Sequence, residues 1–164
     1  MSEPAPANIA SHLAVMAARQ PHRLAVVCPH ARDAQGRVSY THLTFRQLDA
    51  ASDRLARGFE RLGLRRGTRT AIMVPPGLDF FALTFALFKL GAVPVLIDPG
   101  IGVRHLGLGL AEAAPEAFIG IPKAHLARVI LGWARRSVTI RITVGGRALL
   151  GGTTLDHTHA LGAG

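Results

Sequence analysis

The chain has 164 residues, 49% hydrophobic and 18% charged, and this composition excludes a disordered, collagen-like or coiled-coil protein. Its length favours one domain, and its single cysteine, Cys28, excludes an internal disulfide and a cysteine zinc cluster. The net charge of +9 is spread over every segment, and the cations are almost all arginine. Because a nucleic-acid-binding face clusters its cations among aromatic residues, we expect no nucleic-acid partner. We expect a soluble, cytoplasmic protein.

The first predicted element is a short helix. Asn8 is a suitable N-cap, and Ile9, Leu13 and Met16 would lie on one face of a helix that ends before Pro21. Two short apolar runs follow, at residues 24–28 and 38–43, with polar turn residues between them. Their spacing predicts two strands that pair as a hairpin.

The second helix has the clearest start signal in the chain. Thr44 and Gln47 form a capping box, and Leu43 and Leu48 form the hydrophobic staple around it. Apolar residues then recur at helical spacing, and Gly63 is expected to end the helix in the left-handed conformation.

The middle of the chain alternates between apolar strands and helices. The predicted strands are residues 69–74, 93–97 and 117–121, and the predicted helices are residues 78–90, 103–114 and 124–135. In the last helix, the apolar side is formed by Leu126, Val129, Ile130 and Trp133. This alternation predicts an α/β fold, with a mostly parallel sheet covered by helices on both faces.

Residues 78–97 are long enough to be considered as a membrane span. Asp79, Lys89, Gly91 and Pro94 interrupt the stretch, so we interpret it as a buried helix followed by a buried strand, and we expect no membrane span. The N-terminus also lacks the basic start and apolar run of a signal peptide.

The last predicted strand, residues 138–144, alternates apolar and polar positions, which favours a place near a sheet edge. From residue 145 onward the sequence has no periodicity. We therefore divide the chain into an α/β subdomain over residues 8–144 and a Gly-rich flexible tail over residues 145–164.

Two glycine-containing segments are candidates for phosphate-binding loops. Gly100 and Gly102 precede a helix, but His105 stands where a dinucleotide loop needs a third glycine, so we interpret the Asp98–Pro99–Gly100 segment as a structural turn. The Gly151-Gly152-Thr153-Thr154 segment has no lysine to neutralise a phosphate.

The remaining chemistry-bearing residues also have structural interpretations. His157 and His159 with Asp156 could ligate a metal only on a rigid support, and we expect them to be solvated. We expect a buried thiol at Cys28 and a favourable helix-dipole position for Asp79. The residues assign no catalytic, cofactor-binding or metal-binding position.

Three segments resemble the signatures of the adenylate-forming enzymes, the AMP-dependent synthetase and acyl-CoA synthetase superfamily. Residues 43–48 (Leu-Thr-Phe-Arg-Gln-Leu) are similar to its first signature, Leu-Thr-Tyr-x-Glu-Leu. Residues 88–99 (Phe-Lys-Leu-Gly-Ala-Val-Pro-Val-Leu-Ile-Asp-Pro) are similar to its second, and residues 67–75 to the strand between them. Residues 78–83 and 118–123 look most like the fatty-acid–CoA ligase-like branch that includes the β-lactone synthetases of long-chain olefin biosynthesis.

The resemblance implies the N-terminal, incomplete part of an enzyme that activates a fatty acid or another carboxylate as an acyl-adenylate. ATP, Mg²⁺ and coenzyme A are implied for the full-length family, and none is expected to bind to this chain alone. The family's phosphate loop, adenine segment and catalytic lysine do not occur here, so we expect an inactive fragment and consider Lys89 structural.

Two alternatives to this fragment stay open. The first is a non-catalytic module that binds a small molecule or an acyl chain through the surface of residues 78–90 and the turn at Asp98. The second is a split subunit that is completed by a separate chain carrying the missing C-terminal part.

Overall fold

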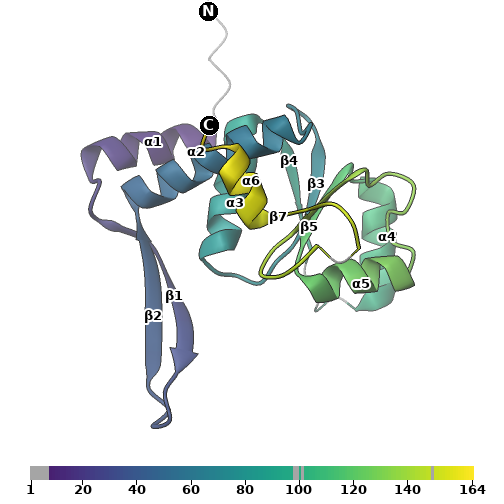
Figure 1. The fold of residues 1–164 in the computed structure, drawn as a ribbon, viewed down its shortest axis with the longest axis horizontal. Helices are drawn as coiled ribbons and strands as arrows, with labels where there is room; N and C mark the ends of the chain where they lie inside the picture. Colours follow the sequence, from purple (N-terminus) through teal and green to yellow (C-terminus); the bar gives the residue numbers. More distant parts are fainter. Residues whose placement is uncertain (1–7, 98–99, 101, 149) are drawn as a thin grey trace, which may run out of the picture.

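The computed structural model describes residues 8–97, 100, 102–148 and 150–164, and statements about the structure refer to these residues. The helices are α1 (Ile9–Arg19), α2 (Phe45–Arg61), α3 (Leu78–Leu90), α4 (Val103–Ala113), α5 (Pro122–Ile130) and α6 (Leu155–Leu161). The strands are β1 (Leu24–Arg32), β2 (Val38–Thr44), β3 (Arg69–Met73), β4 (Val93–Leu96), β5 (Ala117–Gly120), β6 (Ile140–Thr143) and β7 (Thr153–Thr154). Figure 1 shows their arrangement.

Strands β1 and β2 pair antiparallel as a separate two-stranded sheet, which confirms the predicted hairpin. The hairpin projects away from the rest of the molecule (Figure 1). It is longer than expected, because β1 continues through Arg32, which pairs with Val38. At its tip Gly36 has a φ of 80°, and glycine adopts this conformation without strain.

The other strands form a parallel sheet in the order β4-β3-β5-β6-β7, which confirms the predicted α/β class. Strand β3 lies between β4 and β5: Thr70 is in register with Pro94 of β4 on one side and with Ala117 of β5 on the other. Strand β5 is buried along its whole length, as a strand covered on both faces must be.

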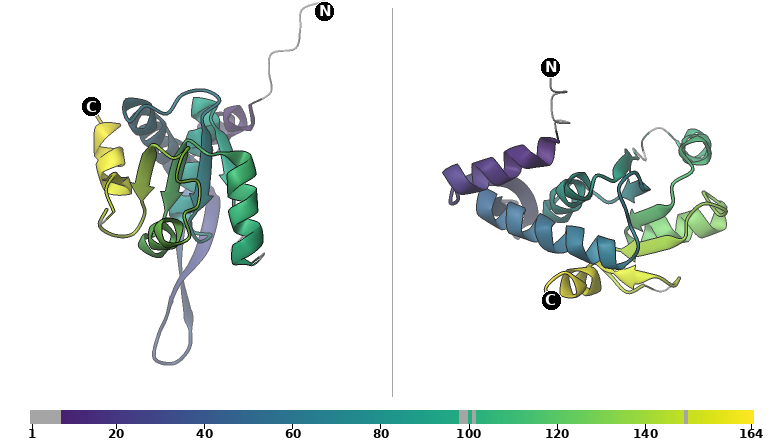
Figure 2. Two further views of the ribbon diagram at one scale, coloured as in Figure 1. Left: turned by 90° about the vertical axis from the view of Figure 1, so that its right-hand side faces the viewer. Right: turned by 90° about the horizontal axis from the view of Figure 1, so that it is seen from above.

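Helices cover the sheet on both sides, as expected, and each side has its own apolar cluster. The larger cluster joins α1, α2, α3 and α6 to one face and includes Leu55, Phe59 and Leu83, none of which has any exposed surface. The smaller one joins α4 and α5 to the opposite face around Phe118. Figure 2 shows the two groups of helices from the side and from above.

Helix α2 starts with the capping box that its sequence predicts. The Thr44 hydroxyl accepts a hydrogen bond from the Gln47 backbone N–H, and the Gln47 side chain accepts one from the Thr44 N–H. At the other end Gly63 has a φ of 98°, so the predicted left-handed glycine lies just beyond the helix. Because these signals are local, they are visible in the sequence.

The expectation of a tail without regular structure is wrong for residues 153–161, which form β7 and α6. Helix α6 packs against α2: Leu155 and Thr158 are buried, and the Arg57 Nε donates a hydrogen bond to the Gly162 carbonyl at 2.9 Å. Figure 2 shows α6, in yellow, beside α2. A seven-residue helix of weak intrinsic propensity depends on such tertiary contacts, which carry no periodic signal.

The last predicted strand lies near the sheet edge, as expected: β6 is next to the two-residue β7, which takes the edge position. One smaller expectation needs correction. In α1 the buried face consists of Ala10, Leu13 and Ala17, while Ile9 is 58% exposed. The Asn8 cap is confirmed, since its side chain accepts a hydrogen bond from the Ala10 N–H. No described helix is long and apolar enough to cross a bilayer.

Candidate functional site: a crevice at the carboxyl edge of the sheet

The connections that leave β3 and β5 run to opposite faces of the sheet. The chain passes from β3 to α3 on the larger cluster's face, and from β5 to α5 on the other face. Because both crossovers start at the carboxyl ends of adjacent parallel strands, they open a crevice between those ends, and open α/β sheets bind ligands at such a switch point. The sheet order therefore places the candidate site between β3 and β5.

A cavity of about 760 Å³ occupies this position. Its floor is formed by the residues that follow β3, β5 and β6, and the hairpin supplies one wall. The lining residues are Cys28, Pro29, His30, Thr41, Val74, Pro75, Pro76, Gly77, Leu78, Asp79, Ile121, Pro122, Lys123, Val144 and Gly145. The size suits a small-molecule ligand or part of a larger one.

Most of the lining is apolar, with few charged groups. Asp79 lies in the first turn of α3, and Lys123 lies in the first turn of α5. The N-caps of these two helices, Gly77 and Ile121, make no side-chain capping hydrogen bond. The crevice thus combines apolar surface with the N-terminal ends of two helices, which favour negative charge. This combination suits a ligand with a hydrocarbon part and an anionic end.

Cys28 is buried, at 8% exposure, and it contributes to the hairpin wall of the crevice. Its neighbour in the paired strand, Thr41, is half-buried and lines the same wall. The hairpin and the loop 74–77 after β3 are therefore two separate parts of the sequence that meet at the cavity. Cys28 and Asp79 stand 51 positions apart in the sequence, and no local pattern signals that they share a cavity.

The predicted turn at residues 98–102 is only partly described. Asp98 and Pro99 lie outside the described residues. Gly102 is the N-cap of α4 with a φ of 86°, a conformation that favours glycine. The interpretation of the segment as a structural turn stays a prediction.

The second glycine segment packs against β6. Gly152 has a φ of 91°, and a Cβ there would lie 2.4 Å from the Arg141 carbonyl oxygen. The next threonine pair forms β7, and the Thr154 hydroxyl accepts a hydrogen bond from the His157 N–H at 3.2 Å as the N-cap of α6. The glycine and the threonine thus have structural roles in holding α6.

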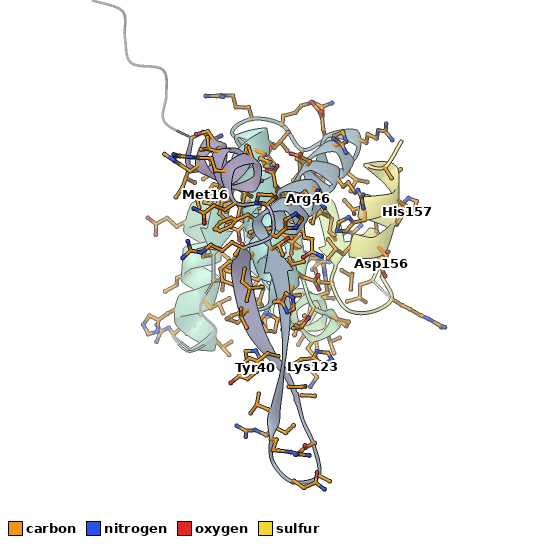
Figure 3. The ribbon with its side chains drawn as sticks, turned by 90° about the vertical axis from the view of Figure 1, so that its left-hand side faces the viewer. Met16, Tyr40, Arg46, Lys123, Asp156 and His157 are labelled. Atoms are coloured by element: carbon orange, nitrogen blue, oxygen red, sulfur yellow. The ribbon has the colours of Figure 1, made fainter. Side chains whose placement is uncertain are left out.

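Asp156, His157 and His159 all lie on α6, and none of them lines the crevice. Figure 3 shows Asp156 and His157 projecting from this helix on the far side from α1. Among the described residues no group of three or more His, Cys, Asp or Glu side chains is arranged to hold a metal ion. Burial, with Arg54 nearby, lowers the pKa of His159 and favours its neutral form.

Lys89 joins α3 to α2. Its Nζ lies 2.6 Å from a carboxylate oxygen of Asp49 and 2.6 Å from one of Asp53, and it also donates to the Asp49 carbonyl at 3.0 Å. The side chain is only 15% exposed. These contacts support the structural role expected for this lysine in the second signature, since they bring together residues 36 and 40 positions apart.

The buried face of α5 differs from the one predicted. The sequence assigned Leu126, Val129 and Ile130 to the core, yet they are 51%, 50% and 71% exposed, whereas His125 and Arg128 are buried. Trp133 is buried as expected, just beyond the helix. Pro122 at the first helical position starts the helix two residues earlier than expected, but hydrophobic periodicity alone could not have placed the polar His125 and Arg128 inside.

The buried polar residues of α5 pack around Phe118. The His125 ring lies edge-on to Phe118 at 5.1 Å, and the Arg128 guanidinium lies 5.7 Å from the same ring. The His125 Nε2 is 3.0 Å from the Ile142 carbonyl oxygen, which places a ring N–H donor on that carbonyl. Burial, followed by the charges of Arg128 and Arg141, lowers the pKa of His125, so the neutral ring is favoured.

Comparison with known proteins places this fold in a family. The family model described as AMP-binding enzyme matches residues 13–159. The olefin β-lactone synthetase of Stenotrophomonas maltophilia strain K279a is 51% identical over 160 residues, which is 96% of this chain and 29% of that protein. The protein of the same name from Xanthomonas campestris pv. campestris is 49% identical over 158 residues, covering 96% of this chain and 28% of its own.

The structural similarity extends over nearly the whole chain. The adenylation domain of a carboxylate reductase from Mycobacterium chelonae superposes with a TM-score of 0.78 at 19% identity, covering 98% of this chain and 30% of that one. The chain spans less than a third of the length of these relatives and matches their N-terminal portion. Since the family model covers most of its length, the chain belongs to the AMP-binding enzyme family, as the three sequence signatures indicated.

Proposed function

We propose that the chain is the N-terminal portion of an enzyme that activates a carboxylate as an acyl-adenylate. In that reaction a carboxylate oxygen forms a bond to the α-phosphorus of ATP, and pyrophosphate leaves. The main support is the family membership over residues 13–159, together with an apolar crevice at the switch point of the sheet.

The two relatives that are 51% and 49% identical to the chain favour a particular substrate class. Both are named olefin β-lactone synthetases. To close a β-lactone from the acyl-adenylate, the oxygen on the β-carbon bonds to the carboxyl carbon, the bond from that carbon to AMP breaks, and AMP and the hydroxyl proton leave. The acceptor would therefore be an internal hydroxyl rather than coenzyme A. We therefore propose a β-hydroxy fatty acid as the substrate of the complete enzyme, with its hydrocarbon part in contact with apolar crevice residues such as Val74 and Ile121.

The described residues of the crevice do not by themselves fit a magnesium–nucleotide complex. Lys123 is the only lysine or arginine in the lining, and Asp79 is the only carboxylate. Phosphate transfer needs several positioned cations or backbone donors, and Mg²⁺ needs a set of oxygen ligands. We assign to this chain the shaping of the substrate crevice and no step of the adenylation itself.

The test compares the chain alone with a chimera. In the chimera the chain replaces the matching 160-residue stretch of the Stenotrophomonas relative, and both proteins are assayed for ATP–pyrophosphate exchange with β-hydroxy and unsubstituted fatty acids. We expect background exchange from the chain alone and acid-dependent exchange from the chimera. Exchange by the isolated chain would contradict the assignment, as would a folded chimera without exchange.

The apolar lining is equally compatible with a second candidate, a module that binds an acyl chain without catalysis. Under this alternative the purified chain would bind a fluorescent fatty acid saturably, while the chimera would show no exchange. A split subunit completed by a separate chain would instead regain exchange when the remaining part of the relative is added as a second polypeptide.

A further inference from the structure

The exposed side of α5 carries an apolar surface that the crevice does not use. Leu126, Val129, Ile130 and Leu131 are between 45% and 71% exposed, and we call these four residues the α5 patch. Positions 126, 129 and 130 share one face of the helix, opposite the buried Ala124 and Arg128. Figure 1 shows α5 at the periphery of the molecule.

Cations stand at both ends of the α5 patch. Lys123 precedes it by one helical turn, and Arg135 and Arg136 follow it; all three are exposed. Arg147 is also exposed, and its neighbour Gly146 approaches the Pro122 ring so closely that a Cβ would lie 2.8 Å away. An exposed apolar surface with basic residues at both ends is therefore built from α5 and two following loops.

The surrounding sequence contains no acidic residue that would neutralise these cations. Residues 117–155 include six lysines and arginines and no aspartate or glutamate. The surface is thus complementary to a partner whose outer layer is negatively charged and whose inner layer is hydrocarbon. An anionic lipid bilayer has these two layers.

The α5 patch lacks the aromatic anchors that are typical of a protein–protein hot spot. The α5 patch consists only of aliphatic side chains, while the energetically important positions of protein interfaces are enriched in tryptophan and tyrosine. The aromatic residue nearby, Trp133, is 9% exposed and packs against Gly107 of α4, where a Cβ would lie 2.9 Å from its indole nitrogen. The apolar face of an interfacial helix buries at the boundary between the headgroups and the acyl chains.

We propose that the α5 patch, with Lys123, Arg135 and Arg136, is a docking surface for an anionic lipid bilayer. This role is peripheral, since no described helix can cross a bilayer. It goes beyond the proposed function, because it concerns where the protein acts and does not depend on the adenylation chemistry.

The test is vesicle flotation with the full chain, using phosphatidylcholine vesicles with and without phosphatidylglycerol at low and high salt. We expect binding to the anionic vesicles that weakens with salt, and little binding to phosphatidylcholine alone. Arg135→Glu with Arg136→Glu should lower the affinity by at least about tenfold, and Leu126→Glu with Ile130→Glu should abolish binding.

Two matched controls keep the result interpretable. Arg19→Glu with Arg23→Glu makes the same change in net charge at exposed positions on and near α1. Ile9→Glu with Val15→Glu replaces two exposed apolar residues of α1. Each should bind as the unchanged chain does, with circular dichroism confirming that every variant is folded.

Three results would overturn the proposal: no binding to anionic vesicles, equal loss of binding in the α1 controls, or retained binding in the patch variants. The lipid partner would likewise be rejected if the chain does not bind vesicles but self-associates through Leu126 and Ile130. That result would point to a second copy of the chain as the partner.

Discussion

The two faces of the sheet are packed very differently. On one face, 16 buried residues from α1, α2, α3, α6 and the sheet form a continuous core among the described residues. On the other, the cluster of α4 and α5 has six, and α5 adds two buried polar side chains, His125 and Arg128, while its large aliphatic residues are exposed. The first face supplies most of the apolar burial that stabilises the fold, whereas the second face leaves aliphatic side chains of α5 exposed in this chain.

The largest expected effect compares equivalent leucines on the two faces. Leu83 of α3 has no exposed surface, and Leu106 of α4 is 4% exposed. Leu83→Ala should lower the free energy of unfolding by about 4 kcal/mol, and Leu106→Ala by about 2.5 kcal/mol, because the thinner layer can collapse around the cavity. Urea denaturation measures both. An equal loss of unfolding free energy in the two variants would show that the two faces contribute equally to stability.

The next effect concerns the contact that holds α6 on the larger face. A Cβ at Gly58 would lie 2.1 Å from the Thr158 carbonyl oxygen, so Gly58→Ala must displace α6, at a cost of about 2 kcal/mol. Relative to the unchanged chain, the Gly58→Ala variant should show a larger increase in hydrogen-exchange rate in α6 than in α3.

Gly109 of α4 is the matched control, because a Cβ there meets no atom within 4 Å. Gly109→Ala should raise stability by about 0.5–1 kcal/mol, since alanine favours a helix. A destabilised Gly109→Ala variant, or a Gly58→Ala variant with an undisturbed α6, would contradict this packing.

A smaller loss of stability is expected where a lysine of α3 forms ion pairs with two aspartates of α2. Lys89→Met removes the cation between Asp49 and Asp53, and since these carboxylates are partly exposed, water replaces much of the contact. We expect a loss of about 1 kcal/mol in chemical denaturation. The exposed Lys123 serves as the control, and Lys123→Met should leave stability unchanged.

The smallest effect is a pH dependence that belongs to the second face. The unfolded His125 takes up a proton near pH 6.5, whereas burial keeps the pKa of the folded side chain below that value. The unfolded state then binds more protons as pH falls through 6.5, so stability decreases with acidification. His125→Gln should reduce this slope between neutral pH and about pH 5. An unchanged slope would mean that His125 is protonated equally in both states.

Local signals explain what the sequence could predict. The capping box of Thr44 and Gln47, the helix end at Gly91 and the alternation of apolar strands each depend on neighbours within a few residues. These features were sufficient for the parallel sheet and for the family signatures. Gly91 has a φ of 73°, as a left-handed helix end requires.

What the sequence missed depends on contacts between distant residues. The packing of α6 requires Gly58 and Thr158, which are a hundred positions apart, and neither segment shows this alone. The reversed face of α5 depends on Phe118 accepting His125 and Arg128 against its ring. The crevice likewise combines the hairpin with three strand ends, so only its general location at the carboxyl edge could be expected.

The most direct test of the crevice as the substrate site is to fill it in the active chimera. Thr41 of the hairpin lines the cavity, whereas Ser39 on the same strand is exposed and does not. We predict that Thr41→Trp lowers kcat/KM for acid-dependent ATP–pyrophosphate exchange at least about tenfold, while Ser39→Trp leaves it unchanged. Equal activity of a folded Thr41→Trp chimera and its Ser39→Trp control would contradict the placement of substrate between β3 and β5.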